Sequence, residues 1–143
     1  SFIVNDRADI AMLAEADGAH LGQEDLPIEA GRRVMGPGKI IGVSTHTVEQ
    51  ARAAQLAGAD YIGFGPMYPG GLKNVCVGNG IEKLRAARAA VKIPIVAIGG
   101  ITESRIPELL AAGADAVAII TDLVRAPDIP AKLRAILAAA RVA

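Results

Sequence analysis

The chain has 143 residues, of which 52% are hydrophobic, 21% are charged and only 3% are aromatic, and its 15 basic side chains balance its 15 acidic ones. We therefore expect one globular domain, residues 1–143, without the basic surface or aromatic platforms that binding to nucleic acid or an anionic membrane would require. Because Cys76 is the only cysteine, the chain cannot form an internal disulfide. The lack of disulfides is typical of proteins in a reducing compartment and predicts a cytoplasmic location.

Short apolar runs alternate along the chain with segments of helical pattern. The sequence predicts six strands, at residues 2–4, 18–22, 40–44, 61–65, 95–99 and 116–120. It also predicts six helices, at residues 8–16, 28–35, 48–57, 81–91, 103–112 and 129–140. Strands that alternate with helices form βαβ units, so we expect a parallel sheet.

Three stretches share one pattern, in which a helix end is followed by small residues, an Asp and then a strand. They read AEADGAHLG, LAGADYIGFG and LAAGADAVAII. Gly58 and Gly113 stand in two of them where the end of a helix needs a left-handed residue. The repeat therefore indicates a unit of helix, turn and strand.

Two parallel architectures suit such units. A doubly wound open sheet predicts a G-x-G-x-x-G phosphate loop after its first strand, and the sequence carries no such loop there. A (β/α)8 barrel instead collects polar residues at the carboxyl ends of its strands, as this sequence does. We therefore expect a TIM (β/α)8 barrel that lacks its first two βα units. We also expect the natural gene product to be about 50–70 residues longer than this chain.

Acidic side chains follow the first two predicted strands, Asp6 in VNDR and Asp25 in HLGQED. At the rim of a barrel these two carboxylates would lie on neighbouring strands, an arrangement that suits Mg²⁺. Asp also caps helices well, and the residues alone favour a capping role for both side chains, although the two roles are compatible.

An IGGI segment at residues 98–101 and Thr121 follow the last two predicted strands. Glycine lets the backbone approach an anion closely, and the loops after strands seven and eight form the common phosphate site of barrels. We therefore expect a phosphate seat here, with an ordinary glycine turn as the alternative. Lys73 lies in a long loop before residue 81, where it is either a cation for a leaving phosphate or a surface lysine.

Ser44, His20 and His46 supply the other polar groups of this rim. The two histidines lack the spacing of a metal-binding pair, and we expect them to be hydrogen-bonded structural residues rather than catalytic bases. Cys76 lies in a glycine-rich loop without a histidine partner, which argues against a nucleophile.

Six stretches resemble thiamine-phosphate synthase in order and spacing: NDRADIA, ADGAHLGQEDLP, IIGVSTHT, GADYIGFGPMYP, IPIVAIGGI and GADAVAII. Thiazole tautomerases share that scaffold and much of the pattern. The resemblance implies a magnesium-dependent transferase of thiamine biosynthesis. Such an enzyme couples hydroxymethylpyrimidine diphosphate, a small-molecule substrate, to thiazole phosphate and releases pyrophosphate.

The resemblance also implies roles for individual residues. Asp6 and Asp25 match the family's magnesium ligands, and Asn5 matches a substrate contact beside the first of them. Ser44 matches a contact to the pyrimidine or the diphosphate, and Lys73 matches a diphosphate contact. These last two residues are therefore the expected catalytic side chains.

The last strand ends match the family's cradle for thiazole phosphate, at Gly100, Ile120 and Thr121. Two features depart from the family: GGLK at residues 70–73 replaces a Thr-x-Thr-Lys stretch, and nothing matches the Gln-x-Arg-x-Lys stretch of its second strand. The alternatives to a synthase are therefore a tautomerase-like isomerase and a non-catalytic paralogue that binds thiamine phosphate. A homo-oligomer is compatible with the pattern, because many barrels pair through their outer helices.

Overall fold

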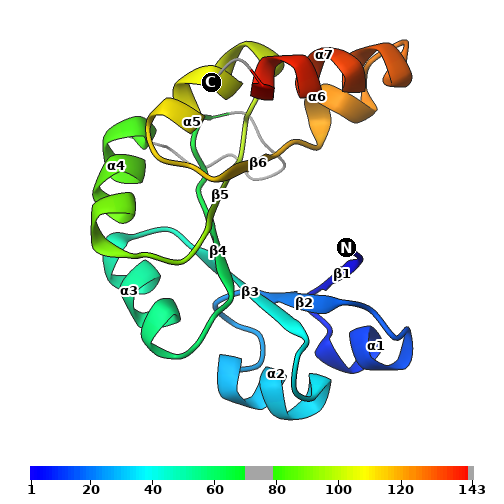
Figure 1. Cartoon of the computed structure of the whole chain (residues 1–143), viewed down its shortest axis with the longest axis vertical. Helices are drawn as coiled ribbons and strands as arrows, with labels where there is room; N and C mark the ends of the chain where they lie inside the picture. Colours follow the sequence, from blue (N-terminus) through cyan, green and yellow to red (C-terminus); the bar gives the residue numbers. More distant parts are fainter. Residues whose placement is uncertain (70–78, 142–143) are drawn as a thin grey trace.

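A computed structural model describes residues 1–69 and 79–141. Six strands form one sheet, in which each strand pairs in parallel with the next one along the chain. The strands are β1 Ile3–Asn5, β2 Gly18–Leu21, β3 Ile40–Thr45, β4 Tyr61–Phe64, β5 Ile95–Ile98 and β6 Ala116–Ala118. The sheet curls into a half-barrel with the helices on its convex side (Figure 1). The six predicted strands are thus confirmed to within two residues at either end.

Helices follow the strands in the expected alternation. They are α1 Ala8–Leu13, α2 Ile28–Met35, α3 Val48–Leu56, α4 Gly80–Ala90, α5 Ile106–Ala111, α6 Thr121–Val124 and α7 Ile129–Arg141, with a 3-10 turn, η1, at Glu103–Arg105. In the described part of the chain, no helix is both long and apolar enough to span a bilayer. Gly58 and Gly113 have φ angles of 86° and 104°, which confirms the left-handed residues predicted at two helix ends.

The helix predicted at residues 103–112 is divided into η1 and α5. Pro107 is the second residue of α5, where proline is well tolerated. Because proline has no N–H, it cannot donate to the carbonyl of Glu103, and one continuous helix through this segment would lack that hydrogen bond. The short helix α6 lies in the segment that the sequence analysis left between the strand at 116–120 and the helix at 129–140.

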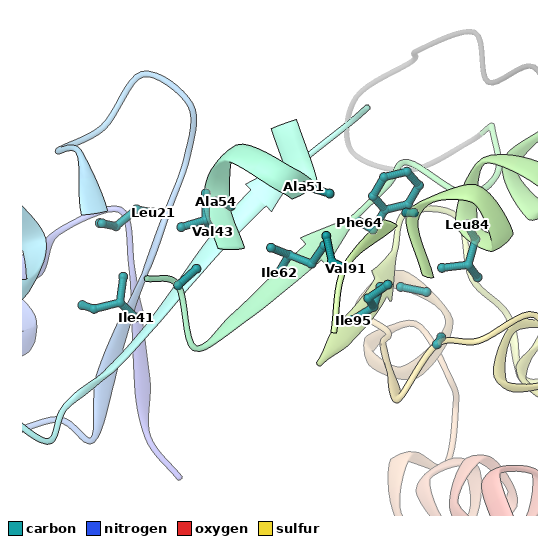
Figure 2. Packing of buried hydrophobic residues seen from close by; sticks show 14 of the residues in the cluster. Leu21, Ile41, Val43, Ala51, Ala54, Ile62, Phe64, Leu84, Val91 and Ile95 are labelled. Atoms are coloured by element: carbon teal, nitrogen blue, oxygen red, sulfur yellow. The ribbon is translucent and has the colours of Figure 1, made fainter. Parts of the chain in front are cut away.

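The hydrophobic core lies between the sheet and the helices. Side chains alternate across a strand, so every second residue faces the same layer. Ile41 and Val43 of β3 and Ile62 and Phe64 of β4 are buried on this outer face. Figure 2 shows them packed with Leu21, Ile95 and Leu84 and with the small side chains of Ala51 and Ala54.

The concave face of the sheet is built differently, from polar side chains and glycines. Gly42 is in register with His20 on one side and with Tyr61 on the other. A Cβ added to Gly42 would lie 2.1 Å from Cζ of Tyr61, so the phenol ring occupies the space above this glycine. Glycine at this position therefore lets two large polar rings lie side by side inside the curl.

The Asp of the repeated pattern ties neighbouring strands together at their amino ends. Its carboxylate accepts a hydrogen bond from a backbone N–H at the start of an adjacent strand. Phe2 N–H donates to Asp17 at 2.6 Å, Ile41 N–H donates to Asp60 at 2.7 Å, and Ile95 N–H donates to Asp115 at 2.8 Å.

Two of these carboxylates also form ion pairs with the helix layer. Arg32 of α2 lies 2.8 Å from Asp60, and Arg88 of α4 lies 2.8 Å from Asp115. The internal repeat therefore has a structural cause, because each Asp accepts a hydrogen bond from a backbone N–H at the amino end of the sheet. In barrel proteins, residues at this end contribute to stability, whereas catalytic residues lie at the carboxyl end.

Candidate functional site

A cavity of about 1410 Å³ lies at the carboxyl ends of the strands. Residues that the sequence analysis predicted as substrate contacts come from four strand ends and line this one cavity: Asn5, Ser44, Gly100, Ile120 and Thr121. The remaining predicted contact, Lys73, lies outside the described residues, as do the GGLK stretch and Cys76. The roles of all six residues stay predictions.

Asp6 follows β1 in a backbone conformation that is uncommon for residues other than glycine. Its φ of 65° lies in the left-handed region, which Asn and Asp tolerate better than most side chains. The Asp6 N–H donates to the carbonyl of His20 on β2 at 2.7 Å, and its Oδ1 accepts from Nδ2 of Asn5 at 2.7 Å. The chain turn after β1 is therefore joined to the next strand.

Asp25 lies in the loop after β2, and its carboxylate folds back onto that loop. Oδ2 accepts a hydrogen bond from the N–H of Gly22 at 2.6 Å. The N-cap residues of α1 and α2 are Arg7 and Pro27, and neither makes a side-chain capping bond. The capping role predicted for Asp6 and Asp25 is therefore wrong, because each carboxylate is directed back toward its own turn.

Both carboxylates lie close enough to His20 to act on it electrostatically. Burial lowers the pKa of the His20 imidazole below its ordinary value, while the charges of Asp6 and Asp25 act in the opposite direction. Neither Asp lines the large cavity, and Asp25 lines a separate hollow of about 310 Å³ against α3. The two acids thus flank one ring at the same end of the sheet.

These two carboxylates fit a hard divalent cation. Magnesium usually takes one or two protein carboxylates and completes its shell with water and substrate phosphate. Within residues 1–69 and 79–141, no group of three or more His, Cys, Asp and Glu side chains could hold a metal ion. The binding of magnesium by Asp6 and Asp25 stays a prediction.

His20 joins two hydroxyl groups on the concave face. Its Nδ1 lies 2.9 Å from Oη of Tyr61 and its Nε2 lies 2.9 Å from Oγ of Ser44. Because a neutral imidazole has one donor and one acceptor, one hydroxyl donates to the ring and the other accepts from it. Both ring nitrogens are thus occupied, which agrees with the predicted hydrogen-bonded role of His20.

Tyr61 was not predicted as a site residue. It begins β4, far from the loop that follows this strand, and reaches the site because its ring lies over Gly42 beside His20, with 5.4 Å between the two ring centroids. Burial raises the pKa of the Tyr61 phenol. The alternation of inward-facing residues along β4 was the available signal. His46 also lines the cavity, and its Nδ1 donates to the carbonyl of Gly65 at 2.6 Å.

The glycines after β5 are required by close packing of the loop after β4. Gly99 and Gly100 have φ angles of 96° and 64°, and a Cβ on Gly100 would lie 2.7 Å from the carbonyl oxygen of Tyr68. Tyr68 also donates its N–H to the carbonyl of Gly99 at 3.1 Å. Packing therefore accounts for the glycines, and the expectation of a phosphate seat depends on the groups around them.

Basic side chains missed by the sequence analysis line this part of the cavity. Arg105 of η1 donates from Nη1 to the carbonyl of Gly100 at 2.6 Å, and its guanidinium lies 4.0 Å from the centroid of the Tyr68 ring. Arg125 and Lys132 line the cavity as well. Arg105 ends η1 and Arg125 follows α6, two short elements that the sequence pattern did not predict, whereas Lys132 lies near the start of α7.

A curled parallel sheet with polar side chains and close-packed glycines at the carboxyl ends of its strands defines an α/β half-barrel with a cavity at its rim. The chain belongs to the thiamine monophosphate synthase family, whose sequence profile matches residues 1–123. The family expected from the motifs is thereby confirmed.

Individual relatives agree with this assignment. The thiamine-phosphate synthase of Methanocella arvoryzae is 51% identical over 138 residues, which cover 94% of this chain and 64% of that protein. The thiamine-phosphate synthase of Moorella thermoacetica is 51% identical over 135 residues, with shares of 94% and 64%. The chain therefore spans about 64% of the length of these two relatives.

A solved structure shares the fold over almost the whole chain. It is that of the thiamine phosphate pyrophosphorylase from Pyrococcus furiosus, which is 38% identical and matches with a TM-score of 0.89. The match covers 98% of this chain and 67% of that one.

Proposed function

We propose that the protein containing this chain is a thiamine-phosphate synthase. It would transfer the hydroxymethylpyrimidine group from its diphosphate to thiazole phosphate, giving thiamine phosphate and pyrophosphate. The observation that carries this proposal is the large cavity, which is lined by polar residues from the ends of β1 and β3 and by the Gly100 and Thr121 segments. The curled sheet would supply six of the eight strands of a (β/α)8 barrel.

The two sides of the rim would serve the two ends of the reaction, with Asn5 on one side of the cavity and Gly100 and Thr121 on the other. Asp6 and Asp25 would hold Mg²⁺, which when bound supplies positive charge against the diphosphate as it leaves. Asn5 lines the cavity next to Asp6 and would contact the same substrate. Lys73 is the proposed second cation for the diphosphate. The Gly100 and Thr121 segments would receive the phosphate of the thiazole.

The proposed chemistry needs little proton transfer. The bond between the pyrimidine methylene and the diphosphate oxygen breaks, and its electron pair leaves with the diphosphate. The thiazole nitrogen then uses its own lone pair to form the new carbon–nitrogen bond, so no base has to remove a proton. A neutral His20 with both nitrogens occupied is consistent with this scheme, since its role is to hold the hydroxyl of Ser44.

Ser44 would contact the pyrimidine ring or the diphosphate. Its Oγ is fixed by His20 at 2.9 Å, and its side chain borders the cavity. A hydroxyl held in one position offers both a donor and an acceptor to the polar edge of an aminopyrimidine. Such prepositioned polar groups contribute to catalysis because the substrate need not order them on binding.

The decisive experiment is an activity assay of the complete gene product. It should be incubated with hydroxymethylpyrimidine diphosphate, thiazole phosphate and Mg²⁺, and thiamine phosphate should be measured by chromatography. Formation of thiamine phosphate that stops when EDTA is added supports the proposal. Binding of thiamine phosphate without turnover, or proton exchange on a thiazole carboxylate phosphate without transfer, would replace it by one of the two alternatives.

A further inference from the structure

Three ionisable side chains meet beside the Gly100 and Thr121 segments. Lys132 Nζ lies 3.0 Å from Oε2 of Glu103 and 2.9 Å from Oδ2 of Asp122. The lysine side chain is only 23% exposed, and both Lys132 and Asp122 line the large cavity. We call these three residues the Lys132 triad. The roles proposed above do not use any of them.

The triad joins three elements that surround the proposed phosphate seat. Glu103 begins η1 three residues after Gly100, Asp122 directly follows Thr121 in α6, and Lys132 lies near the start of α7. Asp122 Oδ2 also accepts the backbone N–H of Glu103 at 3.0 Å, so the two sides of the seat are already linked. Helix α7 packs against η1, α5 and α6 at this end of the sheet (Figure 1).

The charges of the triad are unusual for the surroundings of a phosphate. Two carboxylates next to an anion seat would repel a phosphate, because like charges at short range raise the energy of a bound state. The lysine reduces the sum of their charges from −2 to −1. Its hydrogen bond lowers the pKa of Asp122, while hydrogen bonds to Asp122 and Glu103 raise the pKa of Lys132, so Asp122 and Lys132 are both charged at neutral pH.

We infer that Lys132 is a positioning residue for the phosphate seat and does not itself contact the substrate. It holds the carboxylates of Glu103 and Asp122 on its own ammonium group, keeps the Gly100 and Thr121 segments together, and offsets charge that would otherwise repel the bound phosphate. The inference deepens the proposed function and rests on it for the identity of the phosphate, which belongs to the thiazole substrate.

Calorimetric titration with inorganic phosphate tests the seat without any turnover. In K132M, the dissociation constant for phosphate should rise about tenfold, the equivalent of about 1.4 kcal/mol. K132R keeps the positive charge and should bind within about threefold of the unchanged protein. K92M is the matched control, because Lys92 lies in the loop before β5, at the amino end of the sheet, and should leave phosphate binding unchanged.

A second pair of variants separates electrostatics from simple support. E103Q removes one carboxylate and leaves Lys132 paired with Asp122. The dissociation constant for phosphate should therefore fall by about twofold or more. D122N in the K132M background should recover part of the lost affinity, since an amide oxygen can still accept the N–H of Glu103. A merely structural triad predicts weaker binding in both cases, and either weakening would overturn the inference.

The two proposals fail in different ways. If the triad acts as inferred, K132M raises KM for thiazole phosphate in the transfer assay and leaves KM for the pyrimidine diphosphate within about twofold. An active enzyme whose K132M variant binds phosphate normally, or loses both substrates equally, refutes the inference and leaves the synthase proposal intact. A protein that makes no thiamine phosphate refutes the synthase proposal, while the phosphate titrations still decide on the triad.

Discussion

The amino and carboxyl ends of the sheet use the same residue in opposite ways. At the amino end, Asp60 and Asp115 accept backbone N–H groups of neighbouring strands and pair with arginines at 2.8 Å. At the carboxyl end, the carboxylates of Asp6 and Asp25 accept hydrogen bonds from Asn5 and Gly22 in their own turns, and no Lys or Arg in the described residues forms an ion pair with them. A carboxylate that is already paired stabilises the fold, whereas an unpaired one can receive a cation.

The first prediction removes charge at the carboxyl end. In D25N, an amide oxygen can still accept the N–H of Gly22, so the loop keeps its hydrogen bond and only the charge is lost. If Asp25 holds magnesium, turnover should fall by about 10²–10³-fold, the usual effect of removing one electrostatic contact to developing charge. Steady-state assays over a range of Mg²⁺ concentrations measure this effect. Full activity at ordinary magnesium would contradict the assignment of Asp25.

The second prediction removes a carboxylate at the amino end. In D60A, the backbone N–H of the fully buried Ile41 loses its acceptor, so the free energy of unfolding should fall by about 1–3 kcal/mol. Urea denaturation measures the loss, and kcat at a temperature where the variant is folded should stay unchanged.

D60N is the matched variant for this experiment. It keeps an acceptor for Ile41 and removes the charge that pairs with Arg32, an interaction worth about 0–1 kcal/mol at exposed sites. Equal losses in D60N and D60A would show that the ion pair, rather than the bond to the strand, stabilises this end.

The third prediction compares two left-handed glycines. G100A and G58A each place an alanine at positive φ, which costs about 1–2 kcal/mol of stability in either case. A Cβ at position 58 meets nothing within 4 Å, whereas at position 100 it would lie 2.7 Å from the carbonyl oxygen of Tyr68. Only G100A should therefore also raise KM for thiazole phosphate. Unchanged kinetics in G100A would separate this glycine from the substrate seat.

The fourth and smallest effect is a dependence of stability on pH. Because burial depresses the pKa of His20 below 6.5, the folded protein binds fewer protons than the unfolded chain in that range. The contribution of His20 to stability is then complete above pH 6.5 and declines as the pH falls through the folded pKa. Urea denaturation at pH 8 and at pH 5.5 should show a smaller decline for H20Q than for the unchanged protein. An equal decline would assign the effect to other groups.

Much of the fold could be predicted because its outer face is apolar and regular. Short apolar runs marked all six strands, and glycines after helices marked two of the turns. Segment 103–124 was harder, since a proline divides one helix and four residues form another helix that no periodicity can reveal. These short elements are stabilised by tertiary contacts such as those of Lys132 with Glu103 and Asp122.

The candidate site was predictable as a set of strand ends but not as a set of contacts. Parallel strands bring residues such as Asn5 and Ser44 to one edge whatever their exact orientation. Whether an Asp caps a helix depends instead on local backbone angles, and the φ of 65° at Asp6 could not be read from the residue types. Tyr61 was missed because its position depends on the curl of the sheet and on Gly42 beneath its ring.

Because the Tyr61 ring lies directly over Gly42, the side chains at positions 42 and 61 share one space. Any side chain larger than a hydrogen at position 42 must displace the phenol, and a smaller residue at position 61 would open a hollow of matching size. The helices pack against the opposite face of the same strands, so such an exchange would leave that layer untouched. The support of His20, which borders the cavity, can therefore be altered from inside the curl through paired substitutions at these two positions, with no change to the core.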